Sequence, residues 1–184
     1  PAEPERITTV SQSGYYDTMR AKDGYIYILS RFYADAAAPR SGISAYVPEA
    51  GGDLIAAENI YMPQGRMGSE YTVITSFSLE NPEERTDSKA VFGTGGICYV
   101  SSENIYITES LYGENDADVT QTSIRKVSYS DGILEGVAQT KIDGTLNDSF
   151  SIDEYEGYLR LVTTVTPVNN NVGIQPFYSL DDKI

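Results

Sequence analysis

The feature that most constrains the fold of this chain is a short apolar strand pattern that occurs three times, each time after a polar turn. The three segments are 25–29 (YIYIL, after Asp-Gly), 104–108 (NIYIT, after Ser-Ser-Glu) and 158–164 (YLRLVTT, after Glu-Gly). Runs of aromatic and β-branched residues bounded by turn residues are typical of β-strands. We therefore expect the segments to occupy equivalent places in successive antiparallel sheets. The residues expected to face inward are Ile26, Ile28, Ile105, Ile107, Leu159 and Leu161.

Further strand-like runs surround these segments, so that one four-strand unit recurs along the chain. Such runs precede them at 15–19, 96–100 and 149–152, follow them at 71–79, 122–129 and 173–180, and come a fourth time at 86–92 and 133–142. A four-stranded antiparallel unit that recurs every ~40–50 residues is typical of a β-propeller blade. The sequence therefore predicts an all-β fold of antiparallel, four-stranded, blade-like repeats.

The repeats place residues 1–184 in a single domain. Its blade-like units lie at about 15–92, 96–142 and 148–184, and the first contains a long insertion at 34–70. Propellers close with roughly four to eight blades, so this is a partial β-propeller, and we expect the chain to be a fragment of a longer protein. Incomplete ends leave apolar sheet faces uncovered. We therefore expect the terminal units either to self-associate or to pack against the insertion.

The charge and the residue types of the chain exclude several function classes. With 13 Lys+Arg against 27 Asp+Glu, the formal net charge is −14, which disfavours nucleic acids and anionic membranes as partners. The chain has no histidine, which removes the Ser-His-Asp and Cys-His catalytic arrangements and every His-ligated metal site. A single cysteine rules out an intrachain disulfide. We therefore expect an acidic protein that is not an enzyme.

The segment 150–164, FSIDEYEGYLRLVTT, carries a family resemblance. It is similar to the Phe-Ser-Met-Asp-Glu-Tyr-x-Gly-Tyr-Leu-Arg-x-Ala-Thr-Thr segment of secreted bacterial proteins with a C-terminal β-propeller, which are distantly related to WD40 repeats. The segments 24–28, 60–63 and 100–107 resemble further steps of that family in the same order. The resemblance covers roughly residues 16–180. It implies a propeller fold and an extracellular or cell-surface location, and it implies no reaction.

The neighbouring acids Asp153 and Glu154, together with Arg160, are the first candidates for a binding site. Adjacent side chains of a strand point to opposite faces, so the two carboxylates cannot flank one glycosidic bond. A structural role is the favoured alternative, in which the segment turns a corner of a blade and its carboxylates bond backbone N–H groups or Arg160. Tyr46 and Tyr61 are further candidates, because binding residues often lie on loops over a rigid sheet.

The loop residues Glu114, Asp116 and Asp118 are candidate calcium ligands, because Ca²⁺ takes six to eight oxygen ligands in flexible loops. The loop lacks the spacing of an EF-hand, so a solvated loop tip is the favoured alternative. No other cofactor is expected.

The function that we expect is a non-catalytic, extracytoplasmic binding module for a protein, peptide or glycan. One alternative is a carboxylate-dependent glycoside hydrolase or lyase, which needs two acids from different blades within ~5–9.5 Å of each other. Another is a structural domain of the cell envelope.

Overall fold

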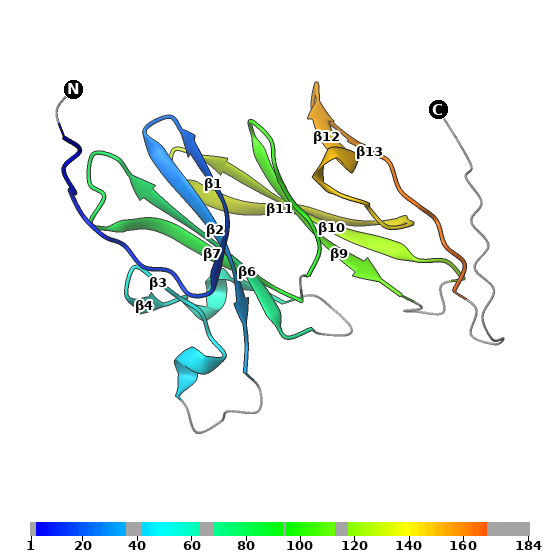
Figure 1. The fold of residues 1–184 in the computed structure, drawn as a ribbon, viewed down its shortest axis with the longest axis horizontal. Helices are drawn as coiled ribbons and strands as arrows, with labels where there is room; N and C mark the ends of the chain where they lie inside the picture. The colour runs from blue at the N-terminus through cyan, green and yellow to red at the C-terminus, as the bar shows by residue number, and fades with distance from the viewer. Residues whose placement is uncertain (1–2, 36–41, 63–67, 94, 113–117, 169–184) are drawn as a thin grey trace. The chain divides into compact units, whose positions relative to one another are not determined.

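The computed structural model describes residues 3–35, 42–62, 68–93, 95–112 and 118–168. Within this part of the chain the regular structure consists of β-strands and three short 3₁₀ turns (Figure 1). The chain divides into two compact units, and each is described by itself. Unit 1 contains residues 1–95 and 127–136, and unit 2 contains residues 96–126 and 137–184.

The first sheet has five strands in the order β1-β2-β6-β7-β5. Its strands are β1 (Tyr15–Lys22), β2 (Tyr25–Tyr33), β6 (Glu70–Ser78), β7 (Arg85–Phe92) and β5 (Ile60–Tyr61). The first four follow one another antiparallel, as the sequence predicted for one blade. The fifth comes from the insertion and pairs parallel with β7, so the sheet is wider than a four-stranded blade.

The second sheet has four strands in the order β11-β10-β9-β8, which is the same sequential order as the first four strands of the first sheet. Its strands are β8 (Cys98–Val100), β9 (Asn104–Leu111), β10 (Gln121–Ser130) and β11 (Ile133–Asp143). A two-stranded sheet follows, made by β12 (Ile152–Tyr155) and β13 (Tyr158–Leu161). The four-stranded repeat is therefore found in part.

The remaining elements are short. The insertion contains η1 (Ile43–Ala45), β3 (Glu49–Ala50), β4 (Asp53–Leu54) and η2 (Ala57–Asn59). The expectation of a strand at 149–152 is wrong for most of its length, because Ser149–Ser151 form the 3₁₀ turn η3. Asp148 caps this turn by accepting the N–H of Phe150 at 2.9 Å, which favours the turn over an extended chain. The expected strand at 173–180 lies outside the described residues.

Burial in β2 differs from the predicted pattern. Tyr27 and Leu29 are fully buried, whereas Ile26 and Ile28 are half-buried. Both faces of this strand are covered, and the alternation alone does not say which face is covered more completely. Ile105 and Ile107 are buried, as predicted. Leu159 and Leu161 are partly buried and pack against the core cluster of unit 2.

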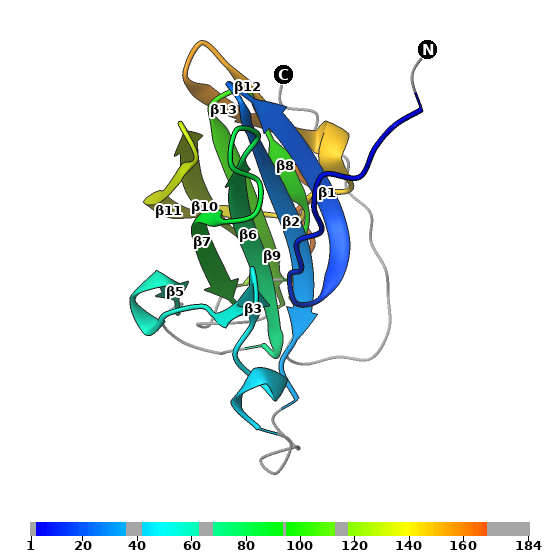
Figure 2. The same ribbon diagram turned by 90° about the vertical axis from the view of Figure 1, so that its left-hand side faces the viewer.

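One face of the first sheet is covered by the insertion. Phe32, Tyr71 and Phe92 lie side by side across β2, β6 and β7 and pack with Ala50 and Ile55. For the first unit, the structure thus shows packing against the insertion, which is one of the two alternatives that the sequence left open, and self-association stays a prediction. The N-terminal segment also crosses β1 and β2, as Figure 2 shows. There Gln12 Nε2 donates to Ser30 Oγ at 2.7 Å and to the carbonyl of Val73 at 3.1 Å. We call this face of the first sheet, which Ala50, Ile55 and Gln12 cover, the capped face.

Candidate functional site

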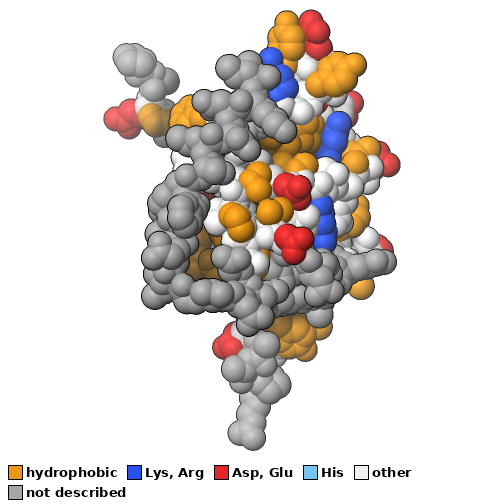
Figure 3. Space-filling model, turned by 90° about the vertical axis from the view of Figure 1, so that its right-hand side faces the viewer, with side chains coloured by type: hydrophobic (Ala, Val, Ile, Leu, Met, Phe, Trp, Pro, Cys, Tyr) orange, Lys and Arg blue, Asp and Glu red, His pale blue; other side chains and the backbone are white. Residues whose placement is uncertain are grey.

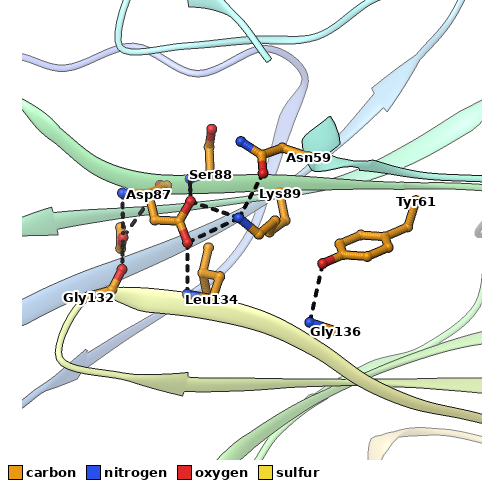
Figure 4. Close-up of polar contacts among 9 residues, drawn as sticks. Asn59, Tyr61, Asp87, Ser88, Lys89, Gly132, Leu134 and Gly136 are labelled. Carbon is orange, nitrogen blue, oxygen red and sulfur yellow. Dashed lines mark hydrogen bonds and ion pairs between the residues drawn. The ribbon is translucent and has the colours of Figure 1, made fainter. Parts of the chain in front are cut away.

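The opposite face of the first sheet contacts the tip of the β10–β11 hairpin, residues 127–136, through the partly buried carboxylate of Asp87 (Figure 4). Asp87 Oδ2 accepts the N–H of Leu134 at 2.9 Å, and Oδ1 accepts the N–H of Ser88 at 2.7 Å. Lys89 Nζ lies 3.0 Å from Asp87 Oδ1 and donates to Asn59 Oδ1 at 2.9 Å. The Lys89 and Asp87 side chains are only 12% and 15% exposed. The ion pair therefore fixes the hairpin to β7 and ties the insertion to the same point.

The turn of this hairpin lies against Tyr27. The N–H of Gly132 donates to the Tyr27 hydroxyl at 2.8 Å, and Ser76 Oγ donates to the carbonyl of Gly132. The Tyr27 ring makes an edge contact with Tyr129, with 4.7 Å between ring centroids. Burial raises the pKa of Tyr27, and this effect outweighs the Gly132 N–H, which acts to lower that pKa. Tyr27, Ser76 and Asp87 lie side by side across β2, β6 and β7. All three form hydrogen bonds to the β10–β11 hairpin.

Of the two candidate tyrosines in the insertion, Tyr61 belongs to the same contact. Its hydroxyl accepts the N–H of Gly136 at 3.3 Å. A Cβ on Gly136 would lie 3.0 Å from the Tyr61 ring, so the glycine makes room for it. Tyr61 is 37% exposed and Tyr46, which ends η1, is 42% exposed. The structure therefore gives Tyr61 a packing role and leaves a binding role for Tyr46 as a prediction.

In unit 2, Glu154 holds the β12–β13 hairpin against β8 and β9. Asn104 Nδ2 donates to Glu154 Oε1 at 2.8 Å, and Ser101 Oγ donates to Oε2. The backbone N–H of Glu154 donates to the Tyr99 hydroxyl at 3.3 Å. Glu154 thus has the structural role that the sequence favoured, although its partners are polar side chains of the preceding repeat instead of Arg160.

Tyr106 lies beneath this hairpin, in a core cluster with Ile152, Leu159 and Leu161. Its ring is 3% exposed. Burial first, and then the neighbouring Glu154 carboxylate, raises the pKa of Tyr106 to about 12. The inner face of the hairpin is therefore a packing face with one polar anchor.

Asp153 and Arg160 lie on the outer face of the hairpin, directly opposite each other across the two strands. Arg160 Nε donates to Asp153 Oδ2 at 3.0 Å, and Nη2 donates to the same oxygen. This pairing lowers the pKa of Asp153. The guanidinium of Arg160 also lies over the Tyr155 ring, 4.7 Å from its centroid. Of the partners that the sequence left open for the carboxylates, Asp153 has Arg160, and its Oδ1 also accepts the Tyr99 hydroxyl at 3.4 Å.

The outer face carries aromatic surface beside this ion pair. Tyr155 and Tyr158 face each other at the turn and are 55% and 75% exposed. Val162, which is 74% exposed, continues the ladder through its N–H to the carbonyl of Ser151 at 2.9 Å. Figure 3 views the side on which β12 and β13 lie in Figure 1 and shows hydrophobic side chains at the surface beside basic and acidic ones. We define the open face as Asp153, Tyr155, Tyr158, Arg160 and Val162.

The open face corresponds to faces that are covered in the two earlier repeats. Tyr27, Tyr106 and Arg160 are each the third residue of the second strand of their repeat. Tyr27 contacts the following β10–β11 hairpin, and Tyr106 contacts the following β12–β13 hairpin. Arg160 is instead 59% exposed. The equivalent position is therefore a packing position in two repeats and a surface position in the third.

The predicted calcium ligands are only partly placed. Glu114 and Asp116 lie outside the described residues. Asp118 is exposed, and its carbonyl accepts the N–H of Val168 at 2.7 Å. Among the described residues, no group of three or more Cys, Asp and Glu side chains is placed to hold a metal ion. A calcium site in this loop stays a prediction.

Sequence reasoning missed Asp87 and Lys89, the ion pair of unit 1. Their spacing of two residues on one predicted strand was the available signal, because it places opposite charges on one face. Sequence reasoning also missed Tyr155 and Tyr158, whose signal was their symmetric position around the Glu-Gly turn.

Comparisons with known proteins agree with the repeat architecture. A family model described as a beta propeller domain matches residues 1–183. An uncharacterized protein of Archaeoglobus fulgidus is 34% identical over 84 residues, which are 45% of this chain and 12% of that protein. The matched segment thus spans a small part of that relative's length. Among the described residues, no helix has the length and apolar character needed to cross a bilayer.

Proposed function

Because the chain belongs to the beta propeller domain family, we propose that it is a non-catalytic binding module that contacts a protein partner through the open face. The observation that carries this proposal is the exposure of Arg160 at the position whose equivalents in the earlier repeats, Tyr27 and Tyr106, are buried against the following hairpin, with Tyr155 and Tyr158 exposed beside it. A surface with this strand geometry and exposed aromatic rings suits a partner that presents β-structure.

The composition of the open face supports binding. Tyrosine and arginine are enriched among the residues that dominate the energetics of interfaces, because each combines a large contact area with hydrogen-bonding groups. The Arg160 guanidinium is already held in place by Asp153 and Tyr155, so less side-chain entropy is lost when a partner binds.

The placement of the two acids supports the non-catalytic part of the proposal. A glycosidase needs two carboxylates that flank the same bond. Glu154 is engaged on the inner face by Ser101 and Asn104, and Asp153 is engaged on the outer face by Arg160. This pair therefore offers no common reaction centre.

We place the module at the cell surface or outside the cell. This part of the proposal rests on the resemblance of residues 150–164 to secreted propeller proteins. Fractionation of the source cells, with an antibody against the purified chain, tests it. Recovery of the protein mainly from the cytoplasm would contradict it.

The binding role is tested with a phage-displayed peptide library selected on the purified chain. We expect enriched peptides that lose at least tenfold in affinity on Tyr155→Ala/Tyr158→Ala, because the two rings make most of the apolar contact. The matched control is Tyr112→Ala, which removes a tyrosine that is 68% exposed elsewhere in unit 2 and should leave affinity unchanged.

A parallel arm uses chito-, xylo- and manno-oligosaccharides. Binding of these sugars with the same dependence on Tyr155 and Tyr158 would change the ligand class to a glycan. Turnover of a sugar that stops on Asp153→Asn, with folding intact, would overturn the non-catalytic proposal.

A further inference from the structure

We propose that the outer edge of β11 binds an extended, basic segment of a partner protein by β-strand addition. The site is the middle of that edge, residues 137–141, which we call the β11 edge. It is a different surface from the open face, so this inference goes beyond the proposed function. It also stands if the open face binds nothing.

The position of β11 in its sheet leaves its backbone groups unpaired on one side. β11 is the terminal strand of the second sheet, and no other described strand lies along its outer side. Such an edge presents N–H and C=O groups that can pair with another chain. Neighbouring repeats contact each other through sheet faces, as Tyr27 and Tyr106 show. The edge is therefore open because of the place of β11 in its own repeat.

The first sheet shows how the same edge is filled. Its fourth strand, β7, is joined along its outer side by β5 of the insertion, with Ile60 opposite Ala90 and Tyr61 opposite Val91. Two residue pairs are thus enough for an added strand in this fold. In the second sheet, no described segment of the chain takes the equivalent place beside β11. We therefore assign that place to a strand of another molecule.

Both ends of the outer side of β11 are bonded within the chain, which defines the length of the site. At the start, the N–H groups of Leu134 and Gly136 donate to side chains of the first sheet. At the end, the carbonyl of Asp143 accepts the hydroxyl of Thr163 at 2.9 Å. In the described part of the chain, no hydrogen bond outside the sheet ladder reaches the backbone of the β11 edge. At ~3.3 Å per residue, the edge offers about 16 Å to a short strand.

The side chains of the β11 edge permit a strand to approach. All of them are exposed, and Val137 is 53% exposed. Residues 136–140 read Gly-Val-Ala-Gln-Thr and contain neither a charge nor a proline. Charged side chains and prolines are the devices that most often keep strand edges from pairing. Only Lys141, at the end of the edge, is of this kind.

Charge selects the occupant. The chain carries a net charge of −14, and Glu135 and Asp143 lie in β11 on either side of the edge. The field of such a protein attracts basic segments and repels acidic ones. A second copy of this chain is disfavoured for the same reason. The occupant that fits is therefore an extended, basic segment of a different protein.

The test is a titration of the ¹⁵N-labelled chain with the peptide Lys-Thr-Val-Thr-Val-Thr-Lys, blocked at both ends, up to about 1 mM. In two-dimensional NMR, we expect amide shifts concentrated at residues 137–141 and slower hydrogen exchange there. The matched probe has N-methyl groups on its three middle residues, which removes donors from both edges of the peptide. It should bind about tenfold more weakly, because strand addition depends on backbone hydrogen bonds.

On the side of the protein, Gln139→Lys places a lysine on the edge, where it opposes pairing and repels the basic peptide. We expect a loss of about tenfold in affinity. Thr9→Lys adds the same charge at an exposed position of the N-terminal segment and should bind as the wild type does. Circular dichroism checks that both variants keep their strands. If Gln139→Lys unfolds, the two peptides compared on the wild type decide the question.

Absence of shifts at the highest peptide concentration, shifts centred outside residues 137–141, or equal binding of the methylated peptide would overturn the inference. Equal affinity for Glu-Thr-Val-Thr-Val-Thr-Glu would overturn the assignment of a basic partner. Shifts at the β11 edge that grow with the concentration of the chain alone would place a second copy there instead. Tyr155→Ala/Tyr158→Ala should leave binding of this peptide unchanged, so that failure of the open face and failure of the β11 edge are distinguishable.

Discussion

Tyr27 and Tyr106 occupy the same position in their repeats, the third residue of the second strand, and each contacts the hairpin of the repeat that follows. Tyr27 does so by accepting a backbone N–H from Gly132, and Tyr106 by packing beneath Ile152 and Glu154. One aromatic position thus anchors successive repeats. Arg160 occupies the same position in the third repeat and is exposed, which is the basis of the proposed interaction surface.

Alanine substitutions at the turn residues Gly132 and Gly157 distinguish the cost of overpacking from the cost of backbone strain. Gly132 and Gly157 have the same φ, +80° and +79°, but a Cβ would lie 2.6 Å from the Tyr25 ring at Gly132 and would meet nothing within 4 Å at Gly157. Gly157→Ala should lower the free energy of unfolding by about 1 kcal/mol through strain alone. Gly132→Ala should lower it by about 2–4 kcal/mol, because overpacking adds to the strain. Equal losses in urea denaturation would contradict the account of the hairpin contact.

The Asp87–Lys89 pair should be needed for the stability of unit 1. Asp87→Ala leaves the Lys89 charge nearly buried and the N–H of Leu134 without its acceptor. We expect a loss of about 2–4 kcal/mol in the free energy of unfolding. Asp53→Ala, at an exposed position of β4, is the control and should change stability by less than about 0.5 kcal/mol. Urea denaturation measures the free energy of unfolding of both variants. Similar losses in the two would contradict the claim that Asp87 stabilises unit 1 through its contacts with Lys89 and Leu134.

The strand pattern of the fold could be read from the sequence because local chemistry determines it. Type I′ turns need two residues with positive φ, and Asp23-Gly24, Asp131-Gly132 and Glu156-Gly157 provide them, with φ near 50° and 80°. The runs between these turns alternate as strands do, so most of β1, β2, β6, β7, β9, β10 and β11 could be predicted within a few residues.

The faces of those strands could not be read in the same way. Alternation separates Tyr27 and Leu29 from Ile26 and Ile28, but which set is more buried depends on residues 127–136, which are distant in sequence. The same limit applies to the sites. The Asp153–Arg160 contact is between neighbours across a short hairpin and could be predicted, whereas Asp87 and Leu134 meet only in the folded chain.

The hydroxyl of Tyr106 should ionise at a higher pH than that of an exposed tyrosine. Its pKa is raised to about 12, mainly by burial and then by Glu154, so Glu154→Gln should lower it while leaving it above 10. The measurement is the tyrosinate ultraviolet absorbance as a function of pH, taken as the difference from Tyr106→Phe. Glu135→Gln, at an exposed position of β11, is the control and should leave the pKa of Tyr106 unchanged.

The raised pKa of Tyr106 also predicts a loss of stability in alkali. The unfolded chain ionises Tyr106 near pH 10, whereas the folded chain keeps it neutral to about pH 12. The stabilising contribution is therefore complete below pH 10 and is lost as the pH rises from 10 to 12. Tyr106→Phe should show a smaller loss over this range in urea denaturation. An identical alkaline profile for both proteins would mean that Tyr106 is not held as described.

The central claim, that the open face is the interaction surface, is tested most directly by two-dimensional ¹⁵N–¹H NMR of the chain during titration with a selected peptide. We predict amide shifts that are concentrated at residues 153–162, with little change at 25–29 and 104–108, whose equivalent faces are already covered. Shifts that map to the β1–β2 hairpin, or that spread evenly over both units, would contradict the claim.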